Sequence, residues 1–248
     1  MELDLVLVLP VYNEEDCIVA VMREWTTMLS HLGIRYQMIV LNDGSKDRTA
    51  ARLAEFSGDS HVQVIDKANA GHGPTVLQGY RLAVDRAIWA FQCDSDNEMP
   101  ADHFPELWAR REHYDALFGT RTDRVQTLPR KIVSAASRMT VRILFGPGVV
   151  DVNTPYRLMR CSVLKQIIEQ IPEDTFAPNV IISGAFAKAA VPIWNHPVPH
   201  QPRRTGVSMM QWKLCKSAAK AFWQTLSCRP RLDLRRIERA TAVRRSAA

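Results

Sequence analysis

The stretch LVLVLPVYNEE, residues 5–15, joins an unbroken apolar run to a polar turn. Leucine and valine without alternating polar residues are typical of a strand that is buried on both faces, as in a parallel sheet. Residues 14–32 then carry apolar side chains at helical spacing, and Gly33 ends that pattern. The stretch therefore predicts a β-strand followed directly by a helix.

The same strand-and-helix pattern recurs in the residues that follow. Further strands are expected at 38–41, 62–65 and 88–93, with helices that end near residues 56 and 84. Such alternation predicts an α/β fold with a doubly wound, mostly parallel sheet, which binds ligands at the carboxyl ends of its strands. The second half is expected to contain helix 104–112, strand 115–119, helix 130–145, strand 149–158, helices 162–170 and 178–189, and strand 191–198.

Length and composition favour one folded catalytic domain. The chain has 248 residues, of which 46% are hydrophobic and 23% are charged, as in ordinary globular proteins. No apolar run reaches the roughly 18 residues that suggest a spanning helix, and the N-terminus lacks a signal-peptide pattern. The five cysteines are scattered singly without metal-ligand spacing, which is typical of reduced thiols. We therefore expect a cytoplasmic protein.

The positive charge is concentrated at the C-terminal end. Residues 229–248 contain seven arginines against two acidic residues, so this tail carries +5 of the formal net charge of +6. Residues 207–226 place apolar side chains at helical spacing with lysines largely off the stripe, which predicts an amphipathic basic helix. We expect a catalytic domain at 1–206, followed by this helix and tail at 207–248. The helix and tail either contact anionic headgroups at a membrane or pack on the core with a solvated tail; both interpretations stay open.

The segment DSDNE, residues 94–98, directly follows the fourth apolar run. Asp94 and Asp96 leave the strand end two residues apart, so their carboxylates can point the same way. Converging carboxylates repel each other unless a cation or a proton lies between them. Hard oxygen ligands suit Mg²⁺ or Mn²⁺, with substrate phosphates completing the coordination. A short motif of this kind is more often a solvated turn, so its position in the fold must decide.

Three other polar turns follow the preceding expected strands. They are PVYNEE at 10–15, NDGSKDRT at 42–49 and NAGHG at 69–73. Together with residues 94–98 they would build one cleft with a stacking surface for a base, acceptors for the base or ribose, and a metal for a diphosphate. Each turn alone would more often be a helix cap or a plain turn. Their joint position predicts a nucleotide-binding cleft.

These motifs resemble those of the inverting GT-A-fold family 2 glycosyltransferases, typified by dolichyl-phosphate mannose synthase and bacterial polyprenyl-phosphate glycosyltransferases. The resemblance runs from about residue 5 to residue 208 and includes GTR at 119–121 and DVNTPYRLM at 151–159. It implies a Rossmann-like GT-A sheet flanked by helices, a nucleoside-diphosphate sugar donor linked to GDP or UDP, and a bound Mg²⁺ or Mn²⁺. It also implies a polyprenyl or dolichyl phosphate acceptor, and thus peripheral contact with the cytoplasmic face of a membrane.

The resemblance further implies roles for individual residues. It implies that the nucleotide-sugar is bound by Pro10, Tyr12, Glu14, Leu41, Asp43, Asp94, Ser95, Asp96, Arg121 and Arg203. It implies metal ligands at Asp94, Asp96 and Glu98, acceptor-phosphate contacts at Arg130 and Ser134, and catalytic roles for Asp96, Arg121 and Arg130. Guanidinium groups bind phosphate oxygens bidentately, which suits the arginines. Arg130 also recurs at helical spacing with Arg138 and Arg142, so a solvated basic face stays an alternative.

The chain departs from the family pattern at a few positions. Residues 200–209 resemble a substrate-closing loop, but Met209 stands where the synthases carry a lysine. Asn42 replaces the first aspartate of the usual DDGS motif, and Asn179 stands where relatives often carry an acidic residue. Either asparagine could alter the choice of donor.

The acceptor decides whether a general base is needed. A polyprenyl phosphate is already an anionic nucleophile, whereas an alcohol must lose its proton; Asp123 and Asp151 remain candidates for that base. A saccharide or protein hydroxyl acceptor, and a nucleotide-binding module without catalysis, stay open as alternatives. Nucleic acid is not expected as a partner, because the excess charge is confined to the tail and few aromatic residues interleave it. The sugar, the choice between GDP and UDP, and the oligomeric state are left open.

Overall fold

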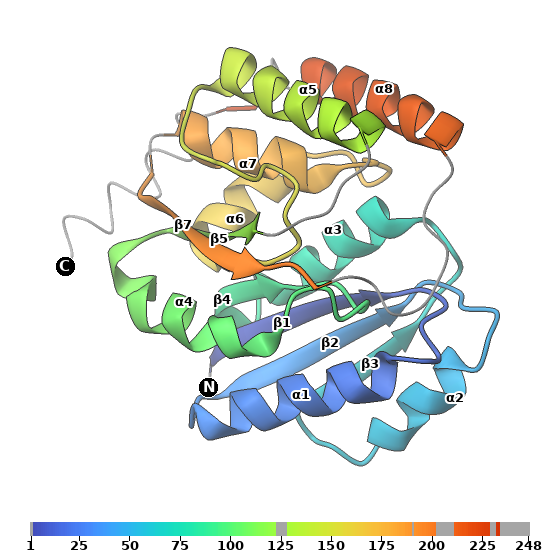
Figure 1. Cartoon of the computed structure of the whole chain (residues 1–248). Helices are drawn as coiled ribbons and strands as arrows, with labels where there is room; N and C mark the ends of the chain where they lie inside the picture. Colours follow the sequence, from blue (N-terminus) through green and yellow to red (C-terminus); the bar gives the residue numbers. More distant parts are fainter. Residues whose placement is uncertain (1, 123–127, 190, 202–210, 229–231, 234–248) are drawn as a thin grey trace.

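The computed structural model describes residues 2–122, 128–189, 191–201, 211–228 and 232–233, and it is built around one seven-stranded sheet (Figure 1). The strands lie in the order β3-β2-β1-β4-β6-β5-β7. Only β6 runs antiparallel to its neighbours, so the expected mostly parallel α/β sheet is confirmed. The strands are β1 (Leu3–Val11), β2 (Tyr36–Asn42), β3 (Val62–Asp66), β4 (Ala87–Gln92), β5 (Ala116–Thr122), β6 (Arg157–Arg160) and β7 (Ile193–Pro199).

Helices cover both faces of the sheet (Figure 1). One face packs against α1 (Ile18–His31) and α4 (Phe104–Arg110), and the other packs against α3 (His72–Ala83), α6 (Cys161–Ile168) and α7 (Pro178–Lys188). Two long helices, α5 (Leu128–Phe145) and α8 (Gln211–Cys228), lie side by side outside α7 (Figure 1). The shorter elements are α2 (Thr49–Leu53) and the 3-10 turns Ala54–Phe56, Ala101–His103 and Arg111–His113.

β1 shows why an unbroken apolar run forms a central strand. Leu5, Leu7 and Leu9 enter the core on the α1 side, while Val6 and Val8 enter the core on the α3 side, and all five are fully buried. Successive side chains of a strand point to opposite faces, so a strand covered on both faces needs apolar residues at every position. The burial predicted for this run is confirmed.

The chain between α5 and β6 differs from the expectation. We expected a strand over 149–158, but β6 begins only at Arg157. The amide of Thr154 donates to the carbonyl of Asp151 at 3.3 Å, so this segment turns back on itself, and Pro155 offers no amide to a neighbouring strand. The apolar pattern of the segment reflects burial of Val149 and Val152 in a loop, and the strand prediction there is wrong.

The C-terminal amphipathic helix is present as α8, which packs against α5 and α7. Thr225 and Cys228 of this helix are buried. The division into a domain at 1–206 and an appendage at 207–248 stays a prediction, since residues 202–210 and 234–248 lie outside the described part of the chain. No described helix combines the length and the apolar character needed to cross a bilayer.

Candidate functional site

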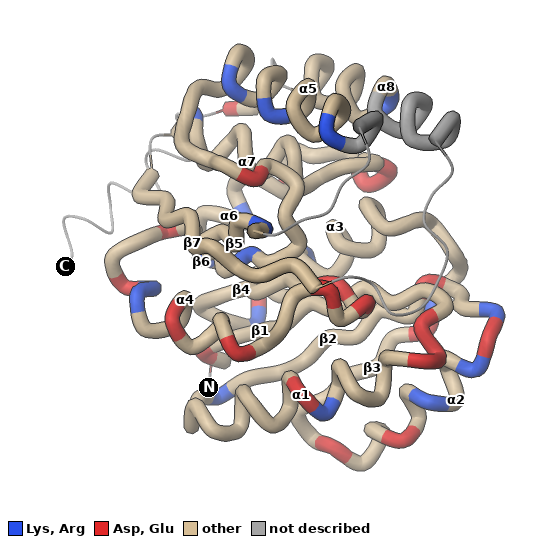
Figure 2. The backbone as a smooth tube through the Cα atoms, viewed as in Figure 1, with Lys and Arg blue, Asp and Glu red and all other residues tan. Residues whose placement is uncertain are grey.

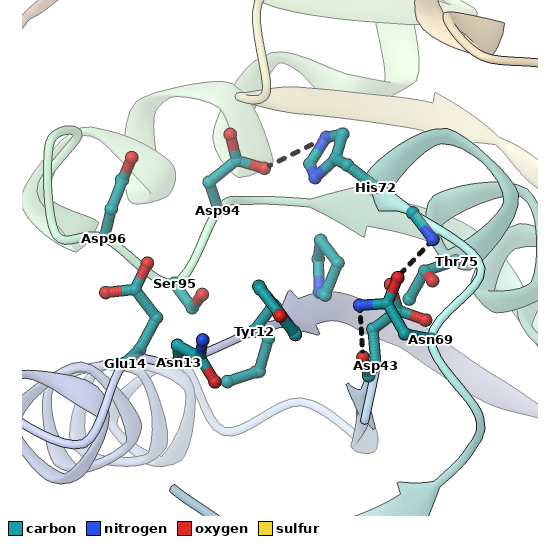
Figure 3. Close-up of a pocket in the computed structure, with 13 residues that line it drawn as sticks. Tyr12, Asn13, Glu14, Asp43, Asn69, His72, Thr75, Asp94, Ser95 and Asp96 are labelled. Atoms are coloured by element: carbon teal, nitrogen blue, oxygen red, sulfur yellow. Dashed lines mark hydrogen bonds and ion pairs between the residues drawn. The ribbon is translucent and has the colours of Figure 1, made fainter. Parts of the chain in front are cut away.

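The carboxyl ends of β2, β1 and β4 open onto one cleft with a volume of about 760 Å³. The chain runs from β1 to β2 and β3 on one side of the sheet and then crosses to β4 on the other side. At such a reversal the connections leave the strand ends in opposite directions, and a crevice remains between them. The residues that line it are Pro10, Val11, Tyr12, Asn13, Glu14, Asp43, Asn69, Gly71, His72, Thr75, Asp94, Ser95 and Asp96 (Figure 3).

The turn after β1 presents an aromatic ring to the cleft. Tyr12 is 43% exposed, although Val11 before it and Glu14 two residues after it are buried. Asn13 adopts a left-handed φ of 53°, which asparagine tolerates better than most residues. Its side-chain oxygen accepts from the amide of Lys46 at 2.8 Å, and its own amide donates to the hydroxyl of Ser45 at 3.0 Å. The turns after β1 and β2 are therefore hydrogen-bonded to each other next to Tyr12.

Asp43 joins the turn after β2 to the glycine-rich segment before α3. One of its carboxylate oxygens contacts the ammonium group of Lys67 and accepts from the amide of Ala70 at 2.9 Å; the other accepts from the amide of Gly71 at 2.9 Å. Burial raises the pKa of this carboxyl, but the hydrogen bonds from Lys67, Ala70, Thr75 and Gly71 together hold the pKa below its ordinary value. The carboxylate thus shapes the wall of the cleft, and its predicted contact with a nucleotide stays a prediction.

Asp43→Asn is expected to lower the free energy of unfolding by about 1–3 kcal/mol, because an amide offers donors where Lys67 and two backbone amides also donate. The depressed pKa in the folded state means that the stabilisation is present above the ordinary carboxyl pKa of 3.8 and is lost as the pH falls through the lowered value. Urea denaturation from pH 7 down to about pH 3 measures this difference. If the difference in free energy of unfolding between variant and native protein vanished well above pH 3.8, the lowered pKa of Asp43 would be contradicted.

Asp94 and Asp96 rise from the turn that follows β4, and both line the cleft (Figure 3). The carboxylate of Asp94 accepts from the side-chain amide of Gln92 at 3.0 Å and lies 3.7 Å from the imidazole of His72. The carboxylate of Asp96 accepts from the backbone amide of Glu98 at 3.2 Å. Two carboxylates on one cleft wall give a concentration of negative charge that suits a divalent cation.

Glu98, the expected third metal ligand, contacts His200. An Oε2 atom of Glu98 lies 2.8 Å from Nε2 of His200, and within the described ranges no three His, Cys, Asp or Glu side chains are grouped as a metal site. The donor set therefore fits a cation that Asp94 and Asp96 share with the oxygens of a bound diphosphate, and it does not fit a complete protein cage. The role predicted for Glu98 gains no support.

Other predicted residues lie away from the cleft wall. Arg121 is only 11% exposed, and it donates from Nε and Nη2 to the two oxygens of Asp151 at 2.7 Å and 2.9 Å. Leu41 is fully buried in the core below α3 and does not line the cleft. Ser134 is half-buried on α5. Arg203 and the side chain of Arg130 fall outside the described part of the structure, so their predicted contacts are untested.

The cleft also contains residues that the sequence did not mark individually. His72 and Asn69 belong to the NAGHG segment, whose position after the third strand was the available signal. Thr75 lies on the first turn of α3 and carries no such signal. Its hydroxyl lies 3.2 Å from the ammonium group of Lys67, so it supports the ion pair with Asp43.

Comparison with known families and proteins gives a consistent result. The profile of the family described as Glycosyl transferase family 2 matches residues 6–168. Similar curated proteins include the undecaprenyl-phosphate 4-deoxy-4-formamido-L-arabinose transferases of Klebsiella pneumoniae and Pectobacterium carotovorum, with 29% and 27% identity over 206 residues. These matches cover 82% of this chain and 61% of each relative, so the chain spans less than two thirds of the relatives' length.

Among solved structures, the fold is similar to that of glucosyl-3-phosphoglycerate synthase from Mycobacterium tuberculosis. Its complex with Mn²⁺, UDP-glucose and phosphoglyceric acid has a TM-score of 0.68 and 18% identity, and the match covers 92% of this chain and 80% of the other. The complex with phosphoglyceric acid alone also has a TM-score of 0.68, with 16% identity and coverage of 91% and 80%. At these identities the likeness concerns the fold.

Proposed function

The chain belongs to glycosyl transferase family 2, and from this we propose that it transfers a sugar from a nucleoside-diphosphate sugar to a polyprenyl phosphate. The family and the GT-A fold expected from the sequence are confirmed. The observation that carries the proposal is the cleft in which Tyr12, Asp94 and Asp96 meet at the carboxyl ends of β1 and β4. It combines an exposed ring with paired carboxylates at a topological switch point.

The cleft accounts for donor binding in two parts. The exposed ring of Tyr12 offers a face on which the uracil or guanine base of the donor can stack. Asp94 and Asp96 would hold a Mg²⁺ or Mn²⁺ ion, which when bound would neutralise charge that develops on the departing diphosphate. The Mycobacterium tuberculosis enzyme of similar fold was crystallised with Mn²⁺ and UDP-glucose, which supports this assignment.

The environment of Asp151 favours a phosphate acceptor over an alcohol. Of the two candidate bases, Asp123 lies outside the described residues, and both oxygens of Asp151 are hydrogen-bonded to Arg121. A carboxylate in such a pair is a poor proton acceptor, because the guanidinium stabilises its charged form. A lipid phosphate needs no base, and the similar curated transferases are named for undecaprenyl phosphate. We therefore propose single displacement with inversion at the anomeric carbon.

A panel of UDP- and GDP-linked sugars with undecaprenyl phosphate and Mn²⁺ or Mg²⁺ tests the proposal. We expect a lipid-linked sugar whose anomeric configuration is opposite to that of the donor. A product with retained configuration would exclude single displacement. Transfer to a saccharide or a protein hydroxyl without lipid phosphate would replace the proposed acceptor with the alternative.

The outer surface of α5 and α8 supports contact with a membrane that carries the acceptor. On α5, Ile132, Met139 and Ile143 are 60%, 59% and 74% exposed, and their spacing places them on one side of the helix. Each follows an exposed cation, namely Lys131, Arg138 and Arg142. Figure 2 shows basic positions coloured blue along α5. On the neighbouring α8, Phe222 and Trp223 are also exposed. We call these residues the α5–α8 face and propose that it lies against anionic lipid on the cytoplasmic side.

The double variant Met139→Glu and Ile143→Glu is expected to weaken binding to anionic vesicles at least about 10-fold, because each buried apolar side chain contributes about 1.5–3 kcal/mol. Cosedimentation with phosphatidylglycerol vesicles measures this, and added salt should weaken the native protein's binding as well. Ile88→Glu, at the amino end of β4, is the matched control. Equal sedimentation of the double variant and the native protein would contradict membrane contact through this face.

A further inference from the structure

Buried polar side chains form a row that ends at Asp94. Its members are Arg157, Asn179 and Gln92. Gln92 is the last residue of β4, and the strand register pairs it with Arg157 at the start of β6. Both side chains are fully buried. Gln92 and Asp94 are two residues apart and so project to the same face. This geometry lets Nε2 of Gln92 donate to Oδ1 of Asp94 at 3.0 Å.

Contacts of the side-chain oxygen of Gln92 fix the orientation of its amide group. Its Oε1 accepts from Nδ2 of Asn179 at 2.9 Å and lies 3.0 Å from the hydroxyl of Tyr80. Burial raises the pKa of the Tyr80 hydroxyl, so this group keeps its proton and remains a donor. The Tyr80 hydroxyl also lies 3.0 Å from Oδ1 of Asn179, to which it can donate, so Nδ2 of Asn179 is the group that faces Oε1 of Gln92. The amide nitrogen of Gln92 therefore points toward Asp94.

Arg157 holds the far end of the row in place. Its guanidinium donates to the carbonyl of Asn179 at 3.0 Å and to the hydroxyl of Ser183, one helical turn further along α7. It also lies 4.4 Å from the centre of the Phe118 ring. The first turn of α7 is thereby tied to the sheet, and with it the amide of Asn179 that orients Gln92.

A row of this kind is costly to bury, since each polar group loses its hydration. An apolar row would fill the same space without that cost, but it would offer no hydrogen bond to Asp94. We propose that Gln92 is a positioning residue, which presents the Asp94 carboxylate to the cation and diphosphate in the cleft. This inference rests on the proposed function. Hydrogen-bond partners of metal ligands typically change metal affinity about 10- to 100-fold when they are replaced.

A substitution at Asn179 provides a second test of the inference. An aspartate at this position would present acceptors to Gln92 in place of the Nδ2 donor. The Gln92 amide would then turn its Nε2 toward residue 179 and its oxygen toward Asp94, which would repel the carboxylate. Asn179→Asp is therefore expected to weaken cation binding although residue 179 does not line the cleft.

The test is titration of Mn²⁺ into the full chain with UDP or GDP present, followed by electron paramagnetic resonance. Gln92→Met preserves length but offers no donor, and we expect it and Asn179→Asp to raise the dissociation constant for Mn²⁺ about 10- to 100-fold. Gln63→Met is the matched control, because it removes a hydrogen bond of 2.7 Å to Arg86 far from the cleft. Thermal melting reports whether each variant is folded.

Two results would overturn the inference. The first is that Gln92→Met melts at a lower temperature but binds Mn²⁺ like the native protein, which would make the row purely structural. If Gln92→Met does not fold, unchanged Mn²⁺ binding by Asn179→Asp has the same meaning. Failure of the proposed function looks different, because the native chain itself would then bind no Mn²⁺ with either nucleotide. If the native chain binds Mn²⁺ with a nucleotide but transfers no sugar to lipid phosphate, only the proposed acceptor is rejected.

Discussion

Asp96→Ala is expected to lower kcat/KM for sugar transfer by about 10²–10³-fold, the loss that follows removal of one group preorganised for charge on a leaving group. Asp96 lines the cleft, and its carboxylate is oriented by the backbone amide of Glu98 at 3.2 Å. Alanine removes the charge that would hold a cation beside the diphosphate. Steady-state kinetics of lipid-linked product formation, across a range of Mn²⁺ concentrations, measure the effect.

Asp59 provides a matched control for this variant. Its carboxylate also accepts from the backbone amide two residues further on, that of His61, at 2.8 Å. Asp59→Ala thus removes the same kind of local hydrogen bond on a turn outside the cleft, and it should leave transfer unchanged. If Asp96→Ala kept transfer at the level of Asp59→Ala, the paired carboxylates would have no part in catalysis.

Arg121→Lys is expected to lower transfer about 10²-fold, since small displacements of groups that align a substrate cost that much. Nε and Nη2 of Arg121 donate hydrogen bonds to both oxygens of Asp151, and Nη2 also lies 3.3 Å from the carbonyl oxygen of Asn153. Lysine keeps the charge but loses the planar fork, so the segment 151–153 would lose its anchor. We expect kcat to fall more than the KM of the donor rises.

The same kind of fork occurs at the opposite end of the sheet and serves as the control. Arg35 donates from Nε and Nη2 to the two oxygens of Asp4 at 3.1 Å and 2.7 Å. Arg35→Lys therefore breaks an equivalent ion pair at a distance from the cleft, and its kinetics should match those of the native protein. Equal kinetics for Arg121→Lys and Arg35→Lys would contradict the predicted catalytic role of Arg121.

Local sequence predicted the parts of the fold in which burial leaves a simple pattern. The run at 5–11 could be recognised because both faces of β1 are covered. The turns at 42–49 and 94–98 could be placed together because parallel strands end at one edge of the sheet. The expected strand at 149–158 failed because loop residues there are buried as well, and burial alone does not distinguish a loop from a strand.

The contacts that orient the site could not be predicted in this way. Gln92 lies at the end of an apolar run, and its partner Asn179 is 87 residues away. The partner of Glu98 is His200, at a separation of 102 residues. Pairings of this kind depend on how helices and loops pack over the sheet, and no spacing within one segment encodes them. The sequence therefore predicted that Tyr12, Asp94 and Asp96 meet at the cleft, but it did not predict the neighbours that hold them.

The most direct test of the proposed donor site is a crystal structure with Mn²⁺ and UDP or GDP, collected at a wavelength where manganese scatters anomalously. We expect one anomalous peak within bonding distance of Asp94 or Asp96 and of the diphosphate oxygens, with the base beside Tyr12. A nucleotide bound elsewhere, or a manganese ion that contacts neither carboxylate, would contradict the proposed function.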